Sequence, residues 1–469
     1  MNKLLPLLLL AALLASCRKE DPNRKLFIYN SNTVNVTISS NHAGNVIPET
    51  FEGLSFENSL LGEDISFLNA DNKVLVQLLR NLGPGIIRMG GATSDFVTWS
   101  AVPRDAATPL NTITPTDIDR LSALSNAAGW PVMFGLNLGE NDARKAAVEA
   151  AYIRQRMGAN LYAFQFGNEP DAYGPYEHLR YAGYSPADFM AEWENYRQVV
   201  GTAVPDASFA GPDIASNNSW IQAFAGREYS RVKLLDGHYY ETGPATSPAI
   251  TYNSILSYNG KLSSLIQSFK AAPGMQQLPF RVTECNNVYG GGKQGVSDVF
   301  ASALWALDTM WILADNGCQG INFHNGLRLH YSPIFSENGV LTARPEYYAM
   351  LAFKYGSSGG RTVAAQVDQG QYCSAHACLI NDICSVTLIN KSIDKDFDFN
   401  VIPTRRVSAV NIQRLTAPSI TALTGVKFSG SSVSADGRFN PGDAEYAPVN
   451  KNSFIVHVPA ASAAVVFAR

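Results

Sequence analysis

The sequence lacks the features that mark nucleic-acid-binding and metal-binding proteins. Only 16% of its 469 residues are charged, and the formal net charge is −4. No basic stripe is present, so nucleic acid is not an expected partner. No Cys-x-x-Cys spacing occurs, so no metal site is predicted. The composition is that of a globular protein, with 46% hydrophobic residues, which is ample for a large core.

The chain also lacks an apolar run long enough to span a bilayer at its start. The run from Leu4 to Leu14 is too short for a mature membrane helix. Leu14-Ala15-Ser16-Cys17 resembles the lipobox of bacterial lipoproteins, which implies a signal peptide over residues 1–17 and lipidation of Cys17. We therefore expect an exported bacterial lipoprotein, membrane-anchored and periplasmic or on the cell surface, with residues 18–31 as an unfolded tether. A plain secretory signal with an incidental cysteine is the alternative.

Few cysteines remain beyond this segment, and their number is odd. They are Cys285, Cys318, Cys373, Cys378 and Cys384, so at least one should stay free. The last three lie close enough in sequence for one local disulfide, although the spacing does not select the pair. Cys285 follows Glu284 directly and has no basic partner nearby in the sequence, which predicts a buried packing residue rather than a catalytic thiol.

Eight short apolar runs alternate with amphipathic stretches between residues 48 and 355. No glycine-rich phosphate loop follows the first run, which argues against a doubly wound open sheet. Apolar strands separated by helices instead predict a (β/α)8 TIM barrel. The expected strands are Phe51–Glu57, Gly85–Gly91, Pro131–Asn137, Leu161–Glu169, Ser208–Asp213, Leu234–Tyr240, Pro279–Asn286 and Gly320–Gly326.

The helical pattern disappears after Tyr355. Residues 356–360 are rich in glycine and serine, and the short alternating runs that follow predict a C-terminal antiparallel β-sandwich over residues 356–469. The segment Thr33–Ile38 alternates in the same way but precedes the barrel. We expect residues 32–47 to supply a strand to the C-terminal sheet, which makes that domain discontinuous.

Two glutamates at strand ends carry the functional prediction. Glu169 ends the fourth expected strand, and Glu284 ends the seventh. Active sites of TIM barrels lie at the C-terminal ends of the strands, so both carboxylates should face one pocket. A pair of carboxylates is the arrangement that cleaves glycosidic bonds, with one acid and one nucleophile or base. Carboxylates do both the proton transfer and the attack, so no metal or organic cofactor is expected.

A family resemblance gives the two glutamates separate roles. Asn168-Glu169-Pro170 resembles the acid/base motif of a clan of retaining glycosidases built on this barrel. Thr283-Glu284-Cys-Asn-Asn-Val-Tyr289-Gly-Gly-Gly-Lys293 is similar to the nucleophile loop of glycoside hydrolase family 79, the β-glucuronidases and heparanases. The resemblance implies that Glu169 is the acid/base and Glu284 the nucleophile.

Further residues are candidates for supporting these two glutamates. Tyr240, or more weakly His238, is expected to hydrogen-bond Glu284, and the resemblance implies that Arg88 fixes the nucleophile region. Asn168 is placed to bind the sugar 2-hydroxyl, and Glu57 is a candidate acceptor for another hydroxyl. Each of these residues has a purely structural alternative, such as packing at the barrel mouth or an ordinary salt bridge.

The loop after Glu284 contains the residues that indicate which sugar is bound. Successive glycines, including Gly291 and Gly292, let backbone N–H groups converge on an anion. Lys293, Tyr289 and Tyr331 would complete a site for the C6 carboxylate of a uronic acid, and a tyrosine like Tyr331 holds this carboxylate in the family. Lys293 stands where mammalian heparanases carry an uncharged residue, which favours a small glucuronide pocket over a groove for sulfated chains.

The sequence thus predicts a retaining β-glucuronidase that hydrolyses terminal β-glucuronic acid through a covalent glycosyl-enzyme. The expected partner is a glucuronide or a glycan that contains uronic acid. Two alternatives remain: a glycosidase of the same clan acting on neutral xylosides or glucosides, and a surface glycan-binding lipoprotein without catalysis. Exo or endo cleavage, the aglycone and the oligomeric state are not predicted.

Overall fold

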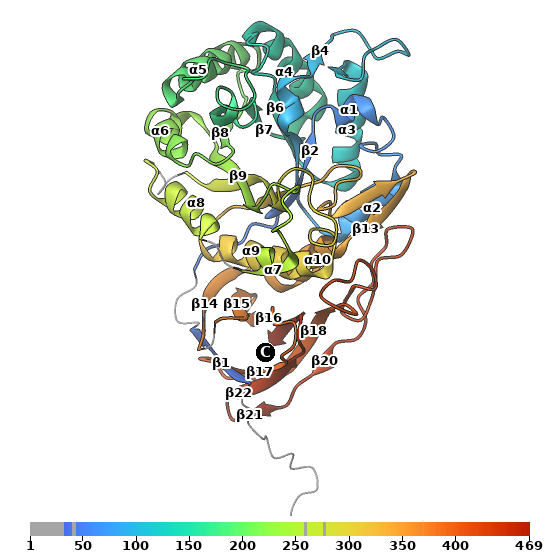
Figure 1. Cartoon of the computed structure of the whole chain (residues 1–469), viewed down its shortest axis with the longest axis vertical. Helices are drawn as coiled ribbons and strands as arrows, with labels where there is room; N and C mark the ends of the chain where they lie inside the picture. The colour runs from blue at the N-terminus through green and yellow to red at the C-terminus, as the bar shows by residue number, and fades with distance from the viewer. Residues whose placement is uncertain (1–31, 40–43, 258–259, 275–277, 369) are drawn as a thin grey trace, which may run out of the picture.

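The computed structural model describes residues 32–39, 44–257, 260–274, 278–368 and 370–469. It contains a (β/α)8 barrel and a β domain that lies against one side of the barrel (Figure 1). The lipobox cysteine Cys17 and the tether lie outside the described residues. Among the described residues, no helix is both long and apolar enough to cross a membrane.

The barrel consists of eight parallel strands. In spatial order the sheet runs β7-β6-β3-β2-β11-β10-β9-β8, and the bridge between Phe164 and Phe209 brings β7 and β8 together. All eight expected strands are present, and the TIM-barrel prediction is confirmed. The strands are β2 (Glu52–Glu57), β3 (Ile86–Gly90), β6 (Val132–Leu136), β7 (Leu161–Phe166), β8 (Ala210–Ile214), β9 (Leu234–Thr242), β10 (Phe280–Val288) and β11 (Ile321–His324).

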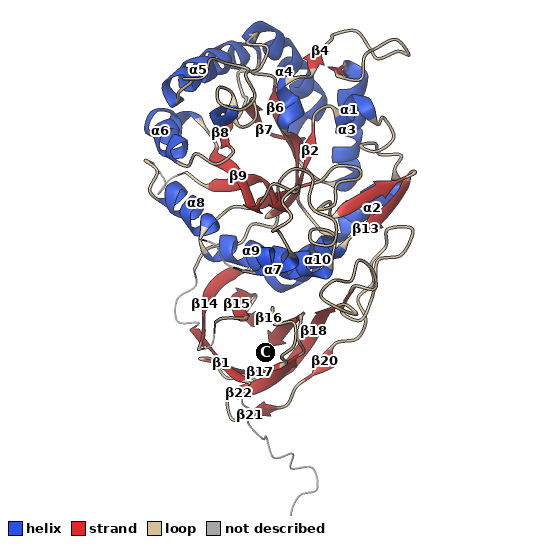
Figure 2. Cartoon of the chain, in the orientation of Figure 1, coloured by secondary structure: helices blue, strands red, loops and turns tan. Residues whose placement is uncertain are grey.

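Helices surround the strands (Figure 2). Two of them begin at a capping box, formed by Thr114 and by Ser185, and a proline occupies the first turn of each. The helices are α1 (Leu60–Glu63), α2 (Lys73–Asn81), α3 (Pro115–Ala128), α4 (Ala143–Met157), α5 (Pro186–Ala203), α6 (Ser219–Glu228), α7 (Tyr252–Leu256), α8 (Lys261–Lys270), α9 (Phe300–Asp315) and α10 (Pro345–Ser357). Two short strand pairs, β4 (Thr98–Trp99) with β5 (Thr112–Ile113) and β12 (Ile334–Glu337) with β13 (Val340–Ala343), lie in the loops.

The β domain curves around its own core. β14 pairs with β15 at its start and with β1 at its end, so one path of strands encloses buried residues such as Val36, Phe399 and Val466. The strands are β1 (Thr33–Ser39), β14 (Arg361–Val367), β15 (Cys373–Ile380), β16 (Ile383–Asn390), β17 (Phe397–Pro403), β18 (Val410–Thr416), β19 (Lys427–Phe428), β20 (Glu445–Tyr446), β21 (Val449–Asn450), β22 (Ser453–Val458) and β23 (Ser462–Ala468).

The N-terminal strand joins this domain, as its alternating pattern predicts. β1 appears in blue beside the red strands of the C-terminus in Figure 1. One detail differs from the expected antiparallel sheet: β1 pairs with β17 in parallel, while it pairs with β14, the strand that follows the barrel, in the antiparallel sense. The glycine-serine segment also differs, since α10 continues to Ser357 before the turn to β14.

The expected local disulfide is absent. All five cysteines among the described residues are free and buried. Cys378 lies opposite Ser385, while Cys384 lies opposite the neighbouring Leu379. Because adjacent residues of a strand point to opposite faces, Cys378 packs into the barrel-side core and Cys384 into the core of the β domain.

Candidate active site

The barrel places the two glutamates in one cavity. Glu169 follows β7 in a left-handed conformation, with φ +52°, and its N–H donates to Asp213 O at 2.9 Å. Glu284 lies within β10 rather than at its end, next to a register shift against β9. One carboxylate oxygen of Glu169 and one of Glu284 lie within 4.8 Å of each other. Retaining glycosidases separate their carboxyl groups by about 5–5.5 Å and inverting ones by about 6.5–9.5 Å, so the spacing is that of a retaining pair.

Arg88 organises the floor of the cavity. It lies inside β3, is fully buried, and donates from Nη1 to Glu284 Oε2 at 2.7 Å and from Nη2 to Asp213 Oδ2 at 2.5 Å. Nε donates to Gln165 Oε1 at 3.1 Å, and Nη1 also reaches Ser55 Oγ at 3.0 Å. Two buried acids therefore share one cation, and the structure places Arg88 at the nucleophile region as the resemblance implies.

Glu284 is held as a carboxylate. Tyr240 OH donates to its Oε1 at 2.8 Å, which is the contact predicted for Tyr240. His324 forms an ion pair, with Nδ1 3.3 Å from Oε2. Burial alone would raise the pKa of Glu284, but the positive charges of His324, His238 and Arg88 outweigh it and hold the pKa well below its usual range. An ionised carboxylate is the state that a nucleophile requires.

The pKa of Glu169 is shifted in the opposite direction to that of Glu284. Its pKa is raised, mainly by burial and also by the negative charge of Glu284, although His238 acts against the shift. His238 Nδ1 lies 2.8 Å from Glu169 Oε1, and its Nε2 lies 3.0 Å from Asp213 Oδ1. Burial would lower the pKa of His238, but the carboxylates of Asp213 and Glu284 raise it to about 10. His238 is thus an imidazolium that donates to two acids at neutral pH.

The prediction that His238 supports the nucleophile is therefore wrong in its hydrogen bonding. Arg88 and Tyr240 already occupy the oxygens of Glu284, so the imidazole turns toward Glu169 and Asp213. Its positive charge still acts on Glu284 through space.

Asp213, on β8, is the main residue that sequence reasoning missed. Its Oδ1 accepts from Gln165 Nε2 at 2.6 Å and from Thr283 Oγ1 at 2.7 Å, and its Oδ2 binds Arg88. Burial would raise its pKa, but Arg88 and His238 lower it to about 2. A signal was available, since Asp213 ends the fifth expected strand just as Glu169 ends the fourth. His324 was missed in the same way at the end of the eighth strand.

Asn168 is fixed in one orientation. Its Oδ1 accepts from Arg88 Nη2 at 2.8 Å, and its backbone N–H donates to Asp95 Oδ2 at 2.9 Å. Because the amide oxygen faces Arg88, the amide NH₂ is the group left to face the cavity, which Asn168 lines. This is the orientation that a donor to a sugar hydroxyl needs.

Glu57, at the end of β2, also lines the cavity. Its Oε2 accepts from the N–H of Thr93 at 2.8 Å and from the Thr93 hydroxyl at 2.5 Å, and Oε1 lies 3.4 Å from His324 Nε2. Burial would raise the pKa of Glu57, but His324 and Thr93 lower it. A carboxylate that lines the cavity fits the predicted role as a hydroxyl acceptor.

The cavity is large, with a volume of about 1480 Å³. The predicted residues that line it are Glu57, Asn168, Glu169, His238, Tyr240, Glu284, Tyr289, Gly291 and Tyr331. Gly292 and Lys293 lie outside the lining, and Arg88 lies beneath it.

The glycine loop forms one end of the cavity. Gly290, Gly291 and Gly292 all have left-handed φ values, +85°, +89° and +77°. A Cβ at Gly292 would lie 2.6 Å from Tyr331 N, so the loop and the Tyr331 segment are in close contact. Gly292 donates to Val288 O at 3.1 Å, whereas the N–H groups of Gly290 and Gly291 meet no protein acceptor within the described residues. Those two groups are available to an anion.

Lys293 does not take the predicted position. Its Nζ donates to two backbone carbonyls of the loop after β9, Ser247 O at 2.6 Å and Ile250 O at 2.8 Å. Lys293 follows the left-handed turn through the glycines and lies outside the lining of the cavity. The lysine and arginine side chains among the described lining residues are instead Lys261 and Arg328, and Arg328 lies on the same loop as Tyr331.

Glu169, His238 and Glu284 are the one group in the described part of the chain whose spacing would suit a metal ion. Both nitrogens of His238 already face carboxylates, and its raised pKa keeps them protonated. A protonated imidazole has no lone pair for a metal, so this trio fits acid–base chemistry better than metal binding.

The comparisons with known proteins agree with this geometry. Residues 375–465 match the model of the glycosyl hydrolase family 79 C-terminal beta domain. A β-glucuronidase of Aspergillus niger is 24% identical, with 81% of this chain and 82% of that protein covered. A β-glucuronidase of Neurospora crassa is 23% identical, with 68% and 66% covered.

A solved structure shares the fold over almost the whole chain. It is a 4-O-α-L-rhamnosyl-β-D-glucuronidase of Fusarium oxysporum, with a TM-score of 0.76 and 19% identity, and it covers 92% of this chain and 99% of its own. The family 79 match covers the C-terminal β domain. Together with the two β-glucuronidase relatives and the retaining pair of carboxylates, it identifies the chain as a glycoside hydrolase that is similar to that family.

Proposed function

We propose that this chain is a retaining β-glucuronidase that releases β-linked glucuronic acid through a covalent glycosyl-enzyme. The observation that carries the proposal is the pair Glu169 and Glu284, which have opposite pKa shifts and oxygens within 4.8 Å in one cavity. The β-glucuronidase relatives support the sugar, and the substrate is a carbohydrate.

In the first step, Glu284 attacks the anomeric carbon while Glu169 donates its proton to the glycosidic oxygen. A bond forms between a Glu284 oxygen and the anomeric carbon, the bond to the leaving oxygen breaks, and the leaving group departs as an alcohol. Glu284 becomes an ester without charge. Its loss of charge removes the repulsion that helps to keep Glu169 protonated, so Glu169 is now suited to its ionised form.

In the second step, Glu169 acts as the base. It takes a proton from water, the water oxygen attacks the anomeric carbon, and the ester bond breaks to regenerate the Glu284 carboxylate. Arg88, Tyr240 and His324 receive this carboxylate in the same positions that they held before the attack. Two displacements return the sugar to its original anomeric configuration.

The end of the cavity at the glycine loop fits the C6 carboxylate of the sugar. The N–H groups of Gly290 and Gly291 and the phenol of Tyr331 are the donors there, and Tyr289 forms the adjacent wall. Arg328 supplies positive charge on the Tyr331 loop, in place of Lys293. Asn168 and Glu57 are the groups that face sugar hydroxyls.

Hydrolysis of 4-nitrophenyl β-glucuronide, measured beside the β-glucoside and the β-xyloside, tests the proposal. We expect the glucuronide to be cleaved with the highest kcat/KM and Glu284→Gln to abolish turnover. Preference for the glucoside or xyloside would instead assign the chain to neutral sugars. Unchanged turnover in Glu284→Gln would overturn the nucleophile, and binding of glucuronides without hydrolysis would indicate a glycan-binding protein.

We also propose that the protein is exported and attached to a membrane through lipid on Cys17. The support is the short apolar run before Leu14-Ala15-Ser16-Cys17 in the sequence. Labelling bacteria that express the full chain with a palmitate analogue tests this proposal. Label and membrane association that both disappear in Cys17→Ala would support the anchor, whereas a soluble, unlabelled mature protein would indicate a plain secretory signal.

A further inference from the structure

The cavity is larger than the end that binds the glucuronic acid requires. Small-molecule sites usually enclose about 300–1,000 Å³, and this cavity has a volume of about 1480 Å³. The carboxylates, the glycine loop and Tyr331 account for one end. The segments after β7 and β8 line part of the remaining space, with Ala172, Tyr176 and Ser216 among the residues there.

The chemistry decides which part of the substrate meets this second end. Glu169 protonates the glycosidic oxygen, so the leaving group must lie on the Glu169 side of the scissile bond. The chain continues from Glu169 through Pro170–Ala172 directly into the segment that carries Tyr176. That segment is therefore the wall against which the leaving group rests.

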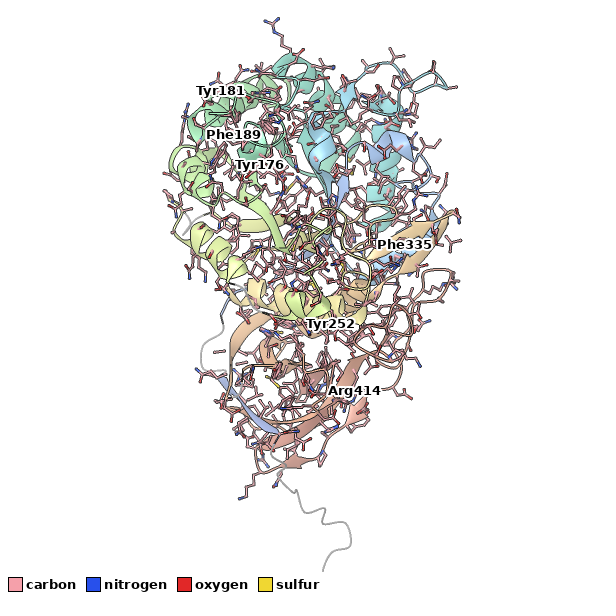
Figure 3. The ribbon with its side chains drawn as sticks, in the orientation of Figure 1. Tyr176, Tyr181, Phe189, Tyr252, Phe335 and Arg414 are labelled. Atoms are coloured by element: carbon pink, nitrogen blue, oxygen red, sulfur yellow. The ribbon has the colours of Figure 1, made fainter. Side chains whose placement is uncertain are left out.

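Tyr176 is an exposed aromatic ring on this wall. It lines the cavity, is 79% exposed, and is labelled in Figure 3. Its backbone is held in place, since the N–H groups of Tyr176 and Glu177 both donate to Ala172 O, at 3.0 and 3.1 Å. The preceding turn is fixed by Tyr173 OH, which donates to Asp95 Oδ2 at 2.7 Å. A solvent-facing ring on a backbone that is held in place is suited to stacking on a flat apolar face.

The charge around the ring is negative. Glu177 follows Tyr176 and lines the cavity, and its Oε2 is buried without a hydrogen-bond partner in the described residues. The four acids that act on it come from three segments: Asp95, Glu57, and the pair Glu169 and Asp171 after β7. Burial, and then these carboxylates, raise the pKa of Glu177 to about 8. Below that pH it is a neutral donor to a hydroxyl, and above it a further negative charge.

We propose that Tyr176 and Glu177 form the leaving-group subsite, which takes an uncharged leaving group with a flat face, either an aryl aglycone or a pyranose ring. The inference rests on the proposed β-glucuronidase function and adds its leaving-group preference. An anionic leaving group is disfavoured, because it would meet the acids that surround Glu177.

The first test replaces the ring. The kcat/KM of wild type, Tyr176→Ala and Tyr176→Phe is measured on 4-nitrophenyl β-glucuronide, on a β-glucuronyl disaccharide with an uncharged reducing sugar, and on methyl β-glucuronide. For Tyr176→Ala we expect a loss of about three- to tenfold on the flat leaving groups relative to the methyl glycoside. Tyr176→Phe keeps the face and should retain most of the activity.

Tyr446 provides a matched control, because it is 78% exposed but lies on β20 of the β domain. Tyr446→Ala should leave all three rates unchanged. Selective loss on the aryl substrate assigns the subsite to aryl aglycones, and selective loss on the disaccharide assigns it to sugars. Equal losses on all three substrates, or none, overturn the inference. Absence of glucuronide hydrolysis in wild type would instead overturn the proposed function itself.

The second test concerns charge. The ratio of kcat/KM between phenyl and 4-carboxyphenyl β-glucuronide is measured at pH 6 and pH 9. The ionisation of Glu169 and Glu284 affects the rates on both substrates equally, so its effect cancels in the ratio. We expect wild type to prefer the phenyl substrate, and more strongly at pH 9, where Glu177 is charged. Glu177→Gln should remove the increase with pH. A preference for the carboxyphenyl substrate would contradict an acidic subsite.

Discussion

Arg88 Nη1 donates to Glu284 Oε2 at 2.7 Å, and the exposed fractions of the two side chains are only 0% and 9%. The same guanidinium binds the buried carboxylate of Asp213 through Nη2. One cation therefore compensates two acids that are removed from water. Removing one partner of a buried ion pair leaves an uncompensated charge, which is far more costly than losing an exposed pair.

The first prediction follows from this arrangement. Arg88→Met should destabilise the protein by about 3–5 kcal/mol, because Glu284 and Asp213 would lose their shared cation. Urea unfolding measures the change. Arg154→Met is the matched control: Arg154 pairs with Asp206 at the surface, where the side chains are 34% and 62% exposed, and about 1 kcal/mol or less is expected. Equal effects of the two substitutions would contradict a compensating role for Arg88.

The spacing of the carboxylates predicts the stereochemical course. Oxygens of Glu169 and Glu284 within 4.8 Å leave no room for a water between Glu284 and the anomeric carbon, so the first product should be the β-anomer. Proton NMR during early hydrolysis of a β-glucuronide distinguishes the anomers before they equilibrate. Initial formation of the α-anomer would indicate single displacement by water and would rule out Glu284 as a nucleophile.

The third prediction concerns how substitution of His238 changes the pH dependence of kcat/KM. Its positive charge lowers the pKa of Glu169, against the larger effect of burial. Glu169 must be protonated to act as an acid, so kcat/KM falls as the pH rises through its pKa. In His238→Gln that pKa should rise, and the alkaline limb of the profile should move to higher pH.

His324 is the control for this pH experiment. It acts on Glu284, which must be ionised, so activity is lost as the pH falls through the pKa of Glu284. His324→Gln raises that pKa, and the acid limb should move to higher pH while the alkaline limb stays in place. Movement of the same limb in both variants would contradict the separate roles of the two glutamates.

Much of the fold could be predicted from the sequence because its signals are local. The eight barrel strands are apolar runs, and the capping boxes at Thr114 and Ser185 mark two helix starts. The positions of Glu169 and Glu284 followed from strand counting. The parallel pairing of β1 with β17 could not be predicted in this way, since it joins residues more than 300 positions apart.

The residues around the glutamates were harder to predict, because side-chain direction depends on neighbouring strands. His238 and Tyr240 lie on one face of β9, yet one meets Glu169 and the other Glu284. Asp213 has a central position only because Arg88, Gln165 and Thr283 converge on it from three other strands. No pattern within β8 alone contains that information.

Lys293 and Tyr331 provide the last prediction, because the sequence assigned both to the sugar carboxylate and the structure separates them. Lys293 Nζ holds Ser247 O and Ile250 O, whereas Tyr331 lines the cavity. Lys293→Met should loosen the loop and lower the rates on glucuronide and glucoside by a similar factor, together with the melting temperature. Tyr331→Phe removes one hydrogen bond to a carboxylate, worth about 1.5–3 kcal/mol.

Tyr331→Phe should therefore reduce kcat/KM for the glucuronide by about 10- to 150-fold, while the melting temperature and any glucoside activity change little. For both variants, the ratio of glucuronide to glucoside turnover is measured together with thermal unfolding. These two measurements distinguish a residue that anchors the loop from one that contacts the sugar. If Lys293→Met lowered only the glucuronide rate and left the stability unchanged, the prediction would be contradicted. Lys293 would then contact the substrate during catalysis instead of the two backbone carbonyls.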